Sequence, residues 1–154
     1  MRVLAMLGLM LLAAPAWGQG ALRYENTRFG FALEVPAGFV AGKSDEAGQS
    51  FELAGEAVTL RARGEPMRGP FAGTVARIGR ELERSGWRTG EQVVTPDWAS
   101  FSAVKGSRMR FGRTILLCDR RSTASWQIEI SAAQFGEMRP VLDRLGRALR
   151  KVGC

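Results

Sequence analysis

Arginine supplies most of the positive charge of this chain, and two groups of basic residues are dense enough to bind an anion. The sequence has 22 lysines and arginines against 15 aspartates and glutamates, a net charge of +7. Guanidinium groups bind phosphates and carboxylates through paired hydrogen bonds. The candidate anion-binding residues are Arg108, Arg110, Arg113, Arg120, Arg121, Arg144, Arg147 and Lys151. The alternative is that they form only the solvated side of a sheet and of a helix.

The absence of histidine from the chain excludes several classes of active site. Ser-His-Asp and Cys-His catalysis, histidine-bound zinc or haem, and a histidine pH switch all require this side chain. Carboxylates that could act in pairs, as in glycoside hydrolases, are present, but no spacing singles out a pair. Asp45 and Glu46 are too few acids for a calcium loop. We therefore expect no enzyme activity, no metal and no cofactor.

The two cysteines, Cys118 and Cys154, predict a disulfide if the chain is exported. The bond would close a loop of about 36 residues, for which chain entropy gives a stabilisation of roughly 4 kcal/mol. The alternative is a free reactive or intermolecular thiol. The absence of a Cys-x-x-Cys motif and of histidine favours the structural bond, as does the apolar run that contains Cys118.

The first twenty residues have the pattern of a secretory signal peptide. Arg2 precedes an apolar run from Val3 to Ala14, and Pro15 and small residues follow. About a dozen apolar residues are too few for a membrane span, which needs roughly 20. We expect residues 1–18 to be removed by cleavage before Gln19, with a cut after Ala16 as the alternative. Residues 19–154 would then form one periplasmic or secreted domain without a transmembrane segment.

Alternating apolar residues predict an antiparallel sheet of about six or seven strands. The clearest strand lies in Arg28 to Phe39, RFGFALEVPAGF, where Phe29, Phe31, Leu33 and Val35 share one face. Ser50 to Gly64 predicts two strands around a glycine turn, and its Arg61 and Arg63 point together to a solvated face. Further strands are expected between Arg88 and Ser131. The polar segment Gly42 to Gln49 predicts a loop.

Two amphipathic helices are predicted to pack against this sheet, which makes the fold class α+β. In the first helix, Phe71 to Ser85, apolar residues recur at helical spacing, and Gly86 suits the left-handed position after a helix. The second is expected to run from Pro140 to Val152, with Gly153 as its cap. The disulfide would then tie the second helix to an inner strand.

The opening segment carries a family resemblance. Tyr24-Glu25-Asn26-Thr27-Arg28-Phe29-Gly30-Phe31, followed by Val35-Pro36, resembles the start of small exported bacterial domains of the PsbP/Mog-like superfamily. The order of the predicted elements is similar to that fold over nearly the whole chain after the signal peptide. The resemblance implies a domain class of assembly and binding factors, and it carries over no ligand or catalytic residue.

These features together predict an exported, non-catalytic binding or accessory domain with a protein partner in the cell envelope. The alternative is a binder of an anionic envelope ligand, a lipid headgroup or lipopolysaccharide phosphate, through the arginine-rich surface. A histidine-free enzyme is the third reading. Nucleic acid is not an expected partner, because export separates the protein from it. Trp87, Trp98 and Trp126 could line a ligand pocket, but their positions favour core packing.

Overall fold

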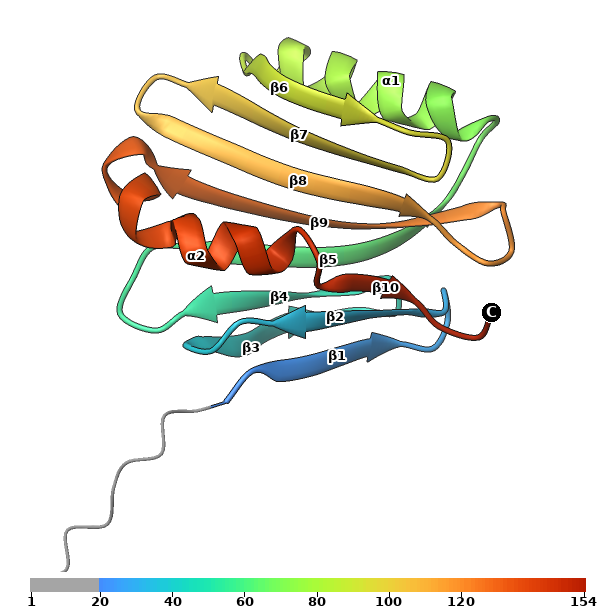
Figure 1. The fold of residues 1–154 in the computed structure, drawn as a ribbon, viewed down its shortest axis with the longest axis horizontal. Helices are drawn as coiled ribbons and strands as arrows, with labels where there is room; N and C mark the ends of the chain where they lie inside the picture. The colour runs from blue at the N-terminus through green and yellow to red at the C-terminus, as the bar shows by residue number, and fades with distance from the viewer. Residues whose placement is uncertain (1–19) are drawn as a thin grey trace, which may run out of the picture.

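The computed structural model describes residues 20–154, so the predicted signal peptide and its cleavage site lie outside the described residues. Within residues 20–154 the chain forms ten strands, two α-helices and one 3-10 turn (Figure 1). The elements are β1 (Leu22–Asn26), β2 (Phe31–Val35), β3 (Phe39–Ser44), β4 (Gly48–Leu53), β5 (Thr59–Pro66), α1 (Phe71–Arg84), β6 (Arg88–Val94), β7 (Trp98–Lys105), β8 (Arg108–Leu116), β9 (Ser122–Ser131), η1 (Ala132–Gln134), α2 (Phe135–Leu145) and β10 (Leu149–Lys151).

The strands form two antiparallel sheets rather than one. Seven strands pair in the order β3-β4-β5-β9-β8-β7-β6, and three pair in the order β1-β2-β10. The predicted α+β class, with an antiparallel sheet and two packed helices, is confirmed. The separate three-stranded sheet was not expected from the sequence.

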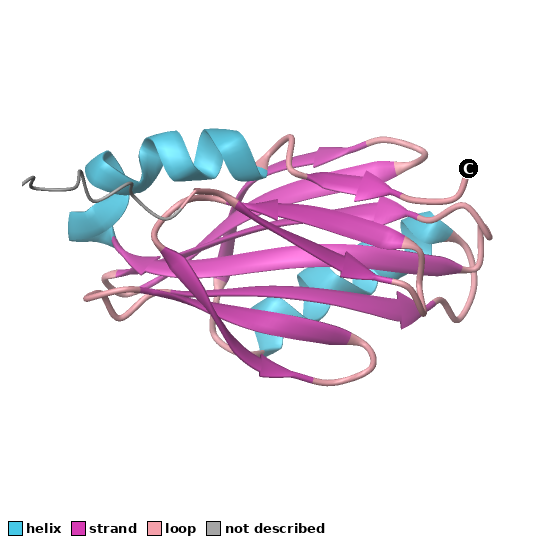
Figure 2. Ribbon diagram, turned by 90° about the horizontal axis from the view of Figure 1, so that it is seen from below, coloured by secondary structure: helices cyan, strands magenta, loops and turns pink. Residues whose placement is uncertain are grey.

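The large sheet has an inner and an outer face, and a helix packs on each (Figure 2). Strand register places Leu60, Ile128 and Phe111 side by side on the inner face, where they meet the small sheet and α2 in the main core. Helix α1 packs on the outer face, where its Val75 and Leu82 join two smaller clusters. Helix α1 lies along β6 at one end of this sheet (Figure 1), which leaves the outer face of β4, β5 and β9 without a covering helix.

The opening segment forms the strand expected of it, with one difference. Phe31, Leu33 and Val35 in β2 are each 0% exposed, which confirms the predicted buried face. Phe29 and Gly30 belong to the turn before β2, so Phe29 is not part of the strand. The Phe29 backbone N–H donates to Asn26 Oδ1 over 3.0 Å, and its ring lies against Gly64, where no side chain would fit.

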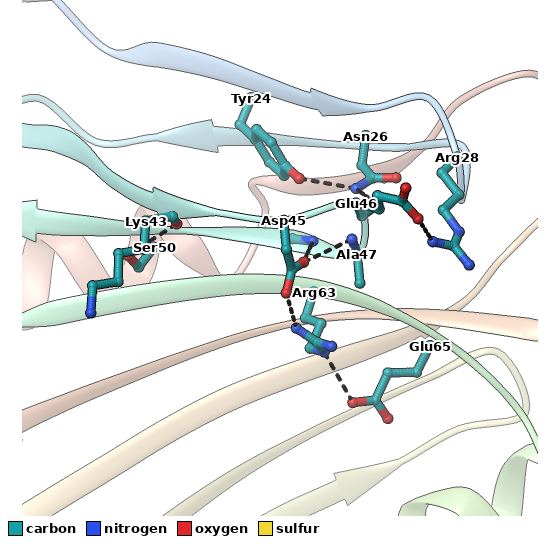
Figure 3. Close-up of polar contacts among 11 residues, drawn as sticks. Tyr24, Asn26, Arg28, Lys43, Asp45, Glu46, Ala47, Ser50, Arg63 and Glu65 are labelled. Atoms are coloured by element: carbon teal, nitrogen blue, oxygen red, sulfur yellow. Dashed lines mark hydrogen bonds and ion pairs between the residues drawn. The ribbon is translucent and has the colours of Figure 1, made fainter.

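The polar residues of this segment join the two sheets (Figure 3). The Asn26 side-chain amide donates to the Tyr24 hydroxyl at 3.0 Å and to the backbone carbonyl of Glu46 at 3.1 Å. Arg28 forms an ion pair with the Glu46 carboxylate. The Tyr24 ring meets the Phe51 ring edge to face, with centroids 5.7 Å apart. The segment that carries the family resemblance is therefore architectural, because it fastens β1 to the turn between β3 and β4.

The prediction of a loop from Gly42 to Gln49 is wrong. This segment is a hairpin in which β3 and β4 are joined by a short turn. Asp45 Oδ1 accepts hydrogen bonds from the backbone N–H groups of Ala47, at 2.8 Å, and Gly48, at 2.9 Å. Aspartate closes turns in this way by bonding to the backbone that follows it. The strands are polar because one side of this hairpin faces solvent.

Helix α1 and its ending agree with the prediction. Gly86 has a φ of 83°, the left-handed conformation that suits glycine. The Trp87 N–H donates to the Leu82 carbonyl at 2.9 Å, as in a Schellman ending. The Trp87 ring then packs with Leu82 and Ala103 under the helix.

The second helix is confirmed, but its predicted bounds, Pro140 to Val152, are wrong at both ends. Helix α2 starts at Phe135, contains Pro140 in its interior and ends at Leu145, and β10 begins after a three-residue turn. Leu149 pairs with Leu33, and the Glu34 N–H donates to the Ala148 carbonyl at 3.1 Å. The chain leaves the helix because the open edge of β2 supplies both backbone hydrogen bonds and apolar contacts.

Cys118 and Cys154 are joined by a disulfide, with 5.7 Å between their Cα atoms. Cys118 lies in the turn after β8, and Cys154 follows β10. The bond therefore fastens the end of the chain to the β8–β9 turn, and it does not tie a helix to an inner strand as predicted.

Candidate functional site

The outer face of the large sheet has three adjacent hollows, one of which borders α1, and Arg61 of β5 lines all of them. The largest, of about 640 Å³, lies over β3, β4 and β5. The second, of about 350 Å³, separates β5 and β9 from α1, and the third, of about 280 Å³, lies near Glu129. We call this region the outer polar face. Its charged residues are Lys43, Asp45, Glu52, Arg61, Arg63, Glu65, Arg77, Glu81, Arg108, Arg110 and Glu129.

The alternation of side chains along β5 and β9 produces this surface. Leu60 and Ala62 point into the main core, so Arg61 and Arg63 between them point outward. Arg61 lies opposite Gln127 of β9 in the pairing register, and small or uncharged side chains on β9 form the floor. Because α1 packs on β7 and β8, the guanidinium groups of β5 stay open to solvent.

Most of the arginines on the outer polar face are paired with carboxylates. Arg63 lies between Asp45, at 3.2 Å, and Glu65, at 3.7 Å (Figure 3). Arg77 on α1 contacts Glu81 at 2.9 Å. Arg77 also lies 3.8 Å from Glu65, so these pairs join side chains of α1, β5 and the β3–β4 turn in one network, although each exposed pair alone contributes little to stability.

A second group of pairs lies at the β8 side of this face. Arg110 donates to Glu129 at 2.8 Å, and Arg108 contacts the other oxygen of the same carboxylate. The Arg110 guanidinium also lies 4.2 Å from the centre of the Trp87 ring, which supports it by a cation–π contact. These arginines are therefore less available to an outside anion.

Arg61 differs from its neighbours. Among residues 20–154 it makes no ion pair within 4.0 Å and no side-chain hydrogen bond, and it is exposed where the three hollows meet. All of its N–H donors are therefore open to a ligand, in the fork that recognises a carboxylate or phosphate. Chemically, the face is suited to holding an anionic group from outside the molecule.

Two of the carboxylates that pair with these arginines, Glu129 and Asp45, have lowered pKa values. Burial acts to raise the pKa of Glu129, but hydrogen bonds from Arg110 and Arg108 outweigh it and lower the pKa. The Ala47 backbone N–H, followed by Arg63, lowers the pKa of Asp45. Both groups therefore stay ionised at neutral pH and keep their arginines occupied.

We expect Glu129→Gln to reduce the acid sensitivity of the protein. A carboxylate with a lowered folded-state pKa stabilises the fold above the unfolded value, 4.5 for glutamate, and loses that contribution as the pH falls through the folded value. Urea unfolding between pH 7 and pH 3 should therefore show a shallower loss of stability in Glu129→Gln than in wild type. The control is Glu137→Gln, whose carboxylate has no ion pair within the described residues. Identical pH profiles for wild type and Glu129→Gln would contradict the role of this ion pair.

The structure does not gather the basic residues selected from the sequence on one surface. Arg108 and Arg110 lie on the outer face, whereas Arg113 lies on the inner face because it is an odd number of residues away. Arg120 and Arg121 are in the β8–β9 turn, where Arg120 is 3.8 Å from Asp97.

The three remaining candidates lie near the C-terminus of the chain. Arg144 is in the last turn of α2, Arg147 follows this helix, and Lys151 is in β10. For the outer polar face, the alternation of residues in β5 predicts that Arg61 and Arg63 lie on the same solvated face of the sheet. It does not predict that α1 borders them.

Neither a metal site nor a membrane-spanning helix is found in the described part of the chain. No group of three histidine, cysteine, aspartate or glutamate residues within residues 20–154 could hold a metal ion. Among the same residues, no helix is both long enough and apolar enough to cross a bilayer.

Comparison with known proteins identifies the fold. No protein family and no curated protein matches the sequence. The solved structure of Mog1p, a Ran-binding protein of Saccharomyces cerevisiae, matches with a TM-score of 0.63 and 9% identity, over 86% of this chain and 95% of that chain. A Mog1 mutant matches with the same score and identity, over 87% and 97% of the two chains.

A cyanobacterial protein has the same architecture. PsbP (CyanoP) from Synechocystis sp. PCC 6803 matches with a TM-score of 0.63 and 11% identity, over 90% of this chain and 97% of that chain. The chain therefore has the PsbP/Mog-like fold that its opening segment predicted. At this level of identity the similarity shows the fold alone.

Proposed function

We propose that the protein is an exported, non-catalytic binding or accessory domain that binds an acidic segment of a protein partner in the cell envelope. The observation that carries this proposal is Arg61, an exposed guanidinium without a partner among residues 20–154, at the point where three hollows of the outer polar face meet. A carboxylate of the partner would bind there through two hydrogen bonds.

The shape and charge of the outer polar face favour a protein partner over a small ligand. Its hollows are wide and adjacent, and they carry charges of both signs in an ordered network. Such a pattern gives specificity and register when it meets a complementary charged surface. Arginine is also enriched among the residues that dominate protein interfaces.

Precedent for a binding role comes from the fold. Mog1p, which shares this architecture, is a Ran-binding protein. This similarity of fold supports a binding function for the present chain. We infer no catalytic role, because the outer polar face lacks histidine, cysteine and any metal-ligating cluster within residues 20–154.

Export is part of the proposal. The sequence pattern of residues 1–18 supports a signal peptide, with cleavage before Gln19 and one domain over residues 19–154. The Cys118–Cys154 disulfide fits an oxidising compartment such as the periplasm. Quantifying the protein in periplasmic and cytoplasmic fractions, and sequencing its mature N-terminus, tests this part directly.

Site-specific photo-cross-linking in living cells tests the binding surface. A photoreactive amino acid at Gln127, on the floor of the outer polar face, should give a discrete cross-linked product that mass spectrometry can identify. The same group at Asp143, exposed on α2 on the other side of the sheet, is the matched control and should not give that product. Equal cross-linking at both positions, or at Asp143 alone, would contradict the proposal.

A further inference from the structure

A separate hollow of about 400 Å³ lies on the inner face of the large sheet, between α2 and the edge strand β6. We call it the α2 trough. Met109 and Phe111 of β8 form its floor, and Phe135 and Leu142 of α2 form one wall. The Phe111 and Phe135 rings stack, with centroids 5.9 Å apart and planes 13° apart. This part of the trough is an apolar surface.

Arg113 is the one basic residue among the described residues that line the trough. Its guanidinium stacks 3.9 Å from the centre of the Trp98 ring. Among residues 20–154 it makes no ion pair and no hydrogen bond, so the N–H edge of the stacked group is unoccupied. Its partial burial lowers the pKa of this guanidinium, whose charge is nevertheless retained at neutral pH. An arginine that is stacked, partly dehydrated and unpaired is suited to binding an anion.

Trp126 is a second unsatisfied group that lines the trough. It lies directly opposite Arg113 in the β8–β9 register and is only 4% exposed. Its indole Nε1–H is buried and has no acceptor in the described part of the chain. Buried donors are normally hydrogen-bonded, so this orphan donor adds a second unsatisfied polar group to the part of the lining where Arg113 lies.

We propose that the α2 trough binds one monomeric amphiphilic monoanion, with its apolar body on Met109, Phe111 and Leu142 and its carboxylate on Arg113. The volume is within the range of small-ligand sites, and the site combines a mainly apolar lining with a few polar groups. Glu91 on the β6 rim also lines the trough, and its negative charge disfavours a ligand with a second anionic group. This site is independent of Arg61 and the outer polar face.

Titration with decanoate below its micelle concentration tests the proposal on protein purified from cells that express the full chain. We expect saturable binding of one decanoate, followed by calorimetry and tryptophan fluorescence, and at least tenfold weaker binding of the neutral decanol. Arg113→Gln should weaken decanoate binding about tenfold or more, because a charge-assisted hydrogen bond is lost. Arg113→Lys should weaken it less, and Glu91→Gln should strengthen it.

The matched control is Arg144→Gln, which removes an exposed charge on α2 that does not line the trough. Its decanoate affinity should equal that of wild type, and the melting temperatures of all variants show whether they are folded. Absence of saturable decanoate binding to wild type would overturn the proposal, as would equal losses in Arg113→Gln and Arg144→Gln. Binding to phosphatidylglycerol vesicles without binding to monomeric decanoate would also overturn it, because the ligand would then be a membrane surface.

Discussion

Replacing both cysteines, C118A with C154A, is expected to lower the free energy of unfolding by about 4 kcal/mol. The disulfide spans 36 residues, a segment that includes β9, α2 and β10. Its loss gives the unfolded chain more conformations. The last strand is then held by few contacts, since β10 has only three residues. Urea unfolding without reductant measures the difference.

Reductant provides the control for this prediction. Reduced wild type and the C118A/C154A variant should unfold at similar urea concentrations, and reductant should not change the variant. Hydrogen exchange should become faster at the Val152 N–H, which donates to the Gly30 carbonyl over 2.9 Å at the end of β10. If the variant and oxidised wild type unfold at the same midpoint, the proposed role of the bond is wrong.

Phe31→Ala is expected to destabilise the protein by about 3 to 5 kcal/mol. Phe31 is 0% exposed, and it lies on β2, the strand that pairs with both β1 and β10. Its ring meets Tyr24 edge to face, with centroids 5.9 Å apart. The substitution leaves a cavity between the two sheets, and its effect is measured by thermal or urea unfolding.

Val94→Ala is the comparison for Phe31→Ala. Val94 lies on the edge strand β6 and is 52% exposed. Its truncation should therefore change stability by less than about 0.5 kcal/mol. Similar losses in the two variants would contradict the assignment of Phe31 to the centre of the fold. A Phe31→Leu variant should lose less than Phe31→Ala, because leucine fills part of the same space.

Local patterns predicted much of the architecture. The spacing of Phe71, Val75 and Leu82 is sufficient for α1, because the helix uses this one apolar stripe and Gly86 ends it. The alternation in β2 and β9 similarly reflects burial on one face of a sheet. These elements can be predicted from the sequence because each depends on the spacing of apolar residues within its own segment.

The C-terminal segment shows where local patterns are insufficient. Four apolar residues have helical spacing, Leu145, Ala148, Leu149 and Val152, but only Leu145 lies in α2. The deciding partner is β2, far earlier in the chain, whose open edge accepts β10. Whether the C-terminal segment forms a helix or a strand depends on that distant edge, which the spacing of its apolar residues does not reveal.

The candidate site was predicted only in part for a similar reason. Alternation along β5 puts Arg61 and Arg63 on one face, but pairing with Asp45 distinguishes Arg63 from Arg61. That ion pair depends on the β3–β4 turn, which the sequence suggested was a flexible loop. Arg110 and Arg113 are close in sequence but lie on opposite faces of the sheet. Their proximity in the sequence therefore does not mean that they belong to one anion-binding surface.

The charge of Arg61 is the central feature of the proposed interface. An Arg61→Glu variant reverses the one guanidinium of the outer polar face that has neither an ion pair nor a hydrogen bond to residues 20–154. It leaves the core unchanged, because the Arg61 side chain points into solvent. The matched variant is Arg144→Glu on α2, which makes the same charge change away from this face.

The yield of the cross-link from Gln127 in living cells, measured in Arg61→Glu, Arg144→Glu and wild-type backgrounds at equal protein levels, is the most direct test. We predict that Arg61→Glu lowers the yield at least tenfold, because it replaces the positive charge that binds the acidic segment with a negative charge that repels it. The yield in Arg144→Glu should be unchanged. An unchanged yield in folded Arg61→Glu protein, or an equal loss in both variants, would contradict the assignment of the outer polar face as the binding surface.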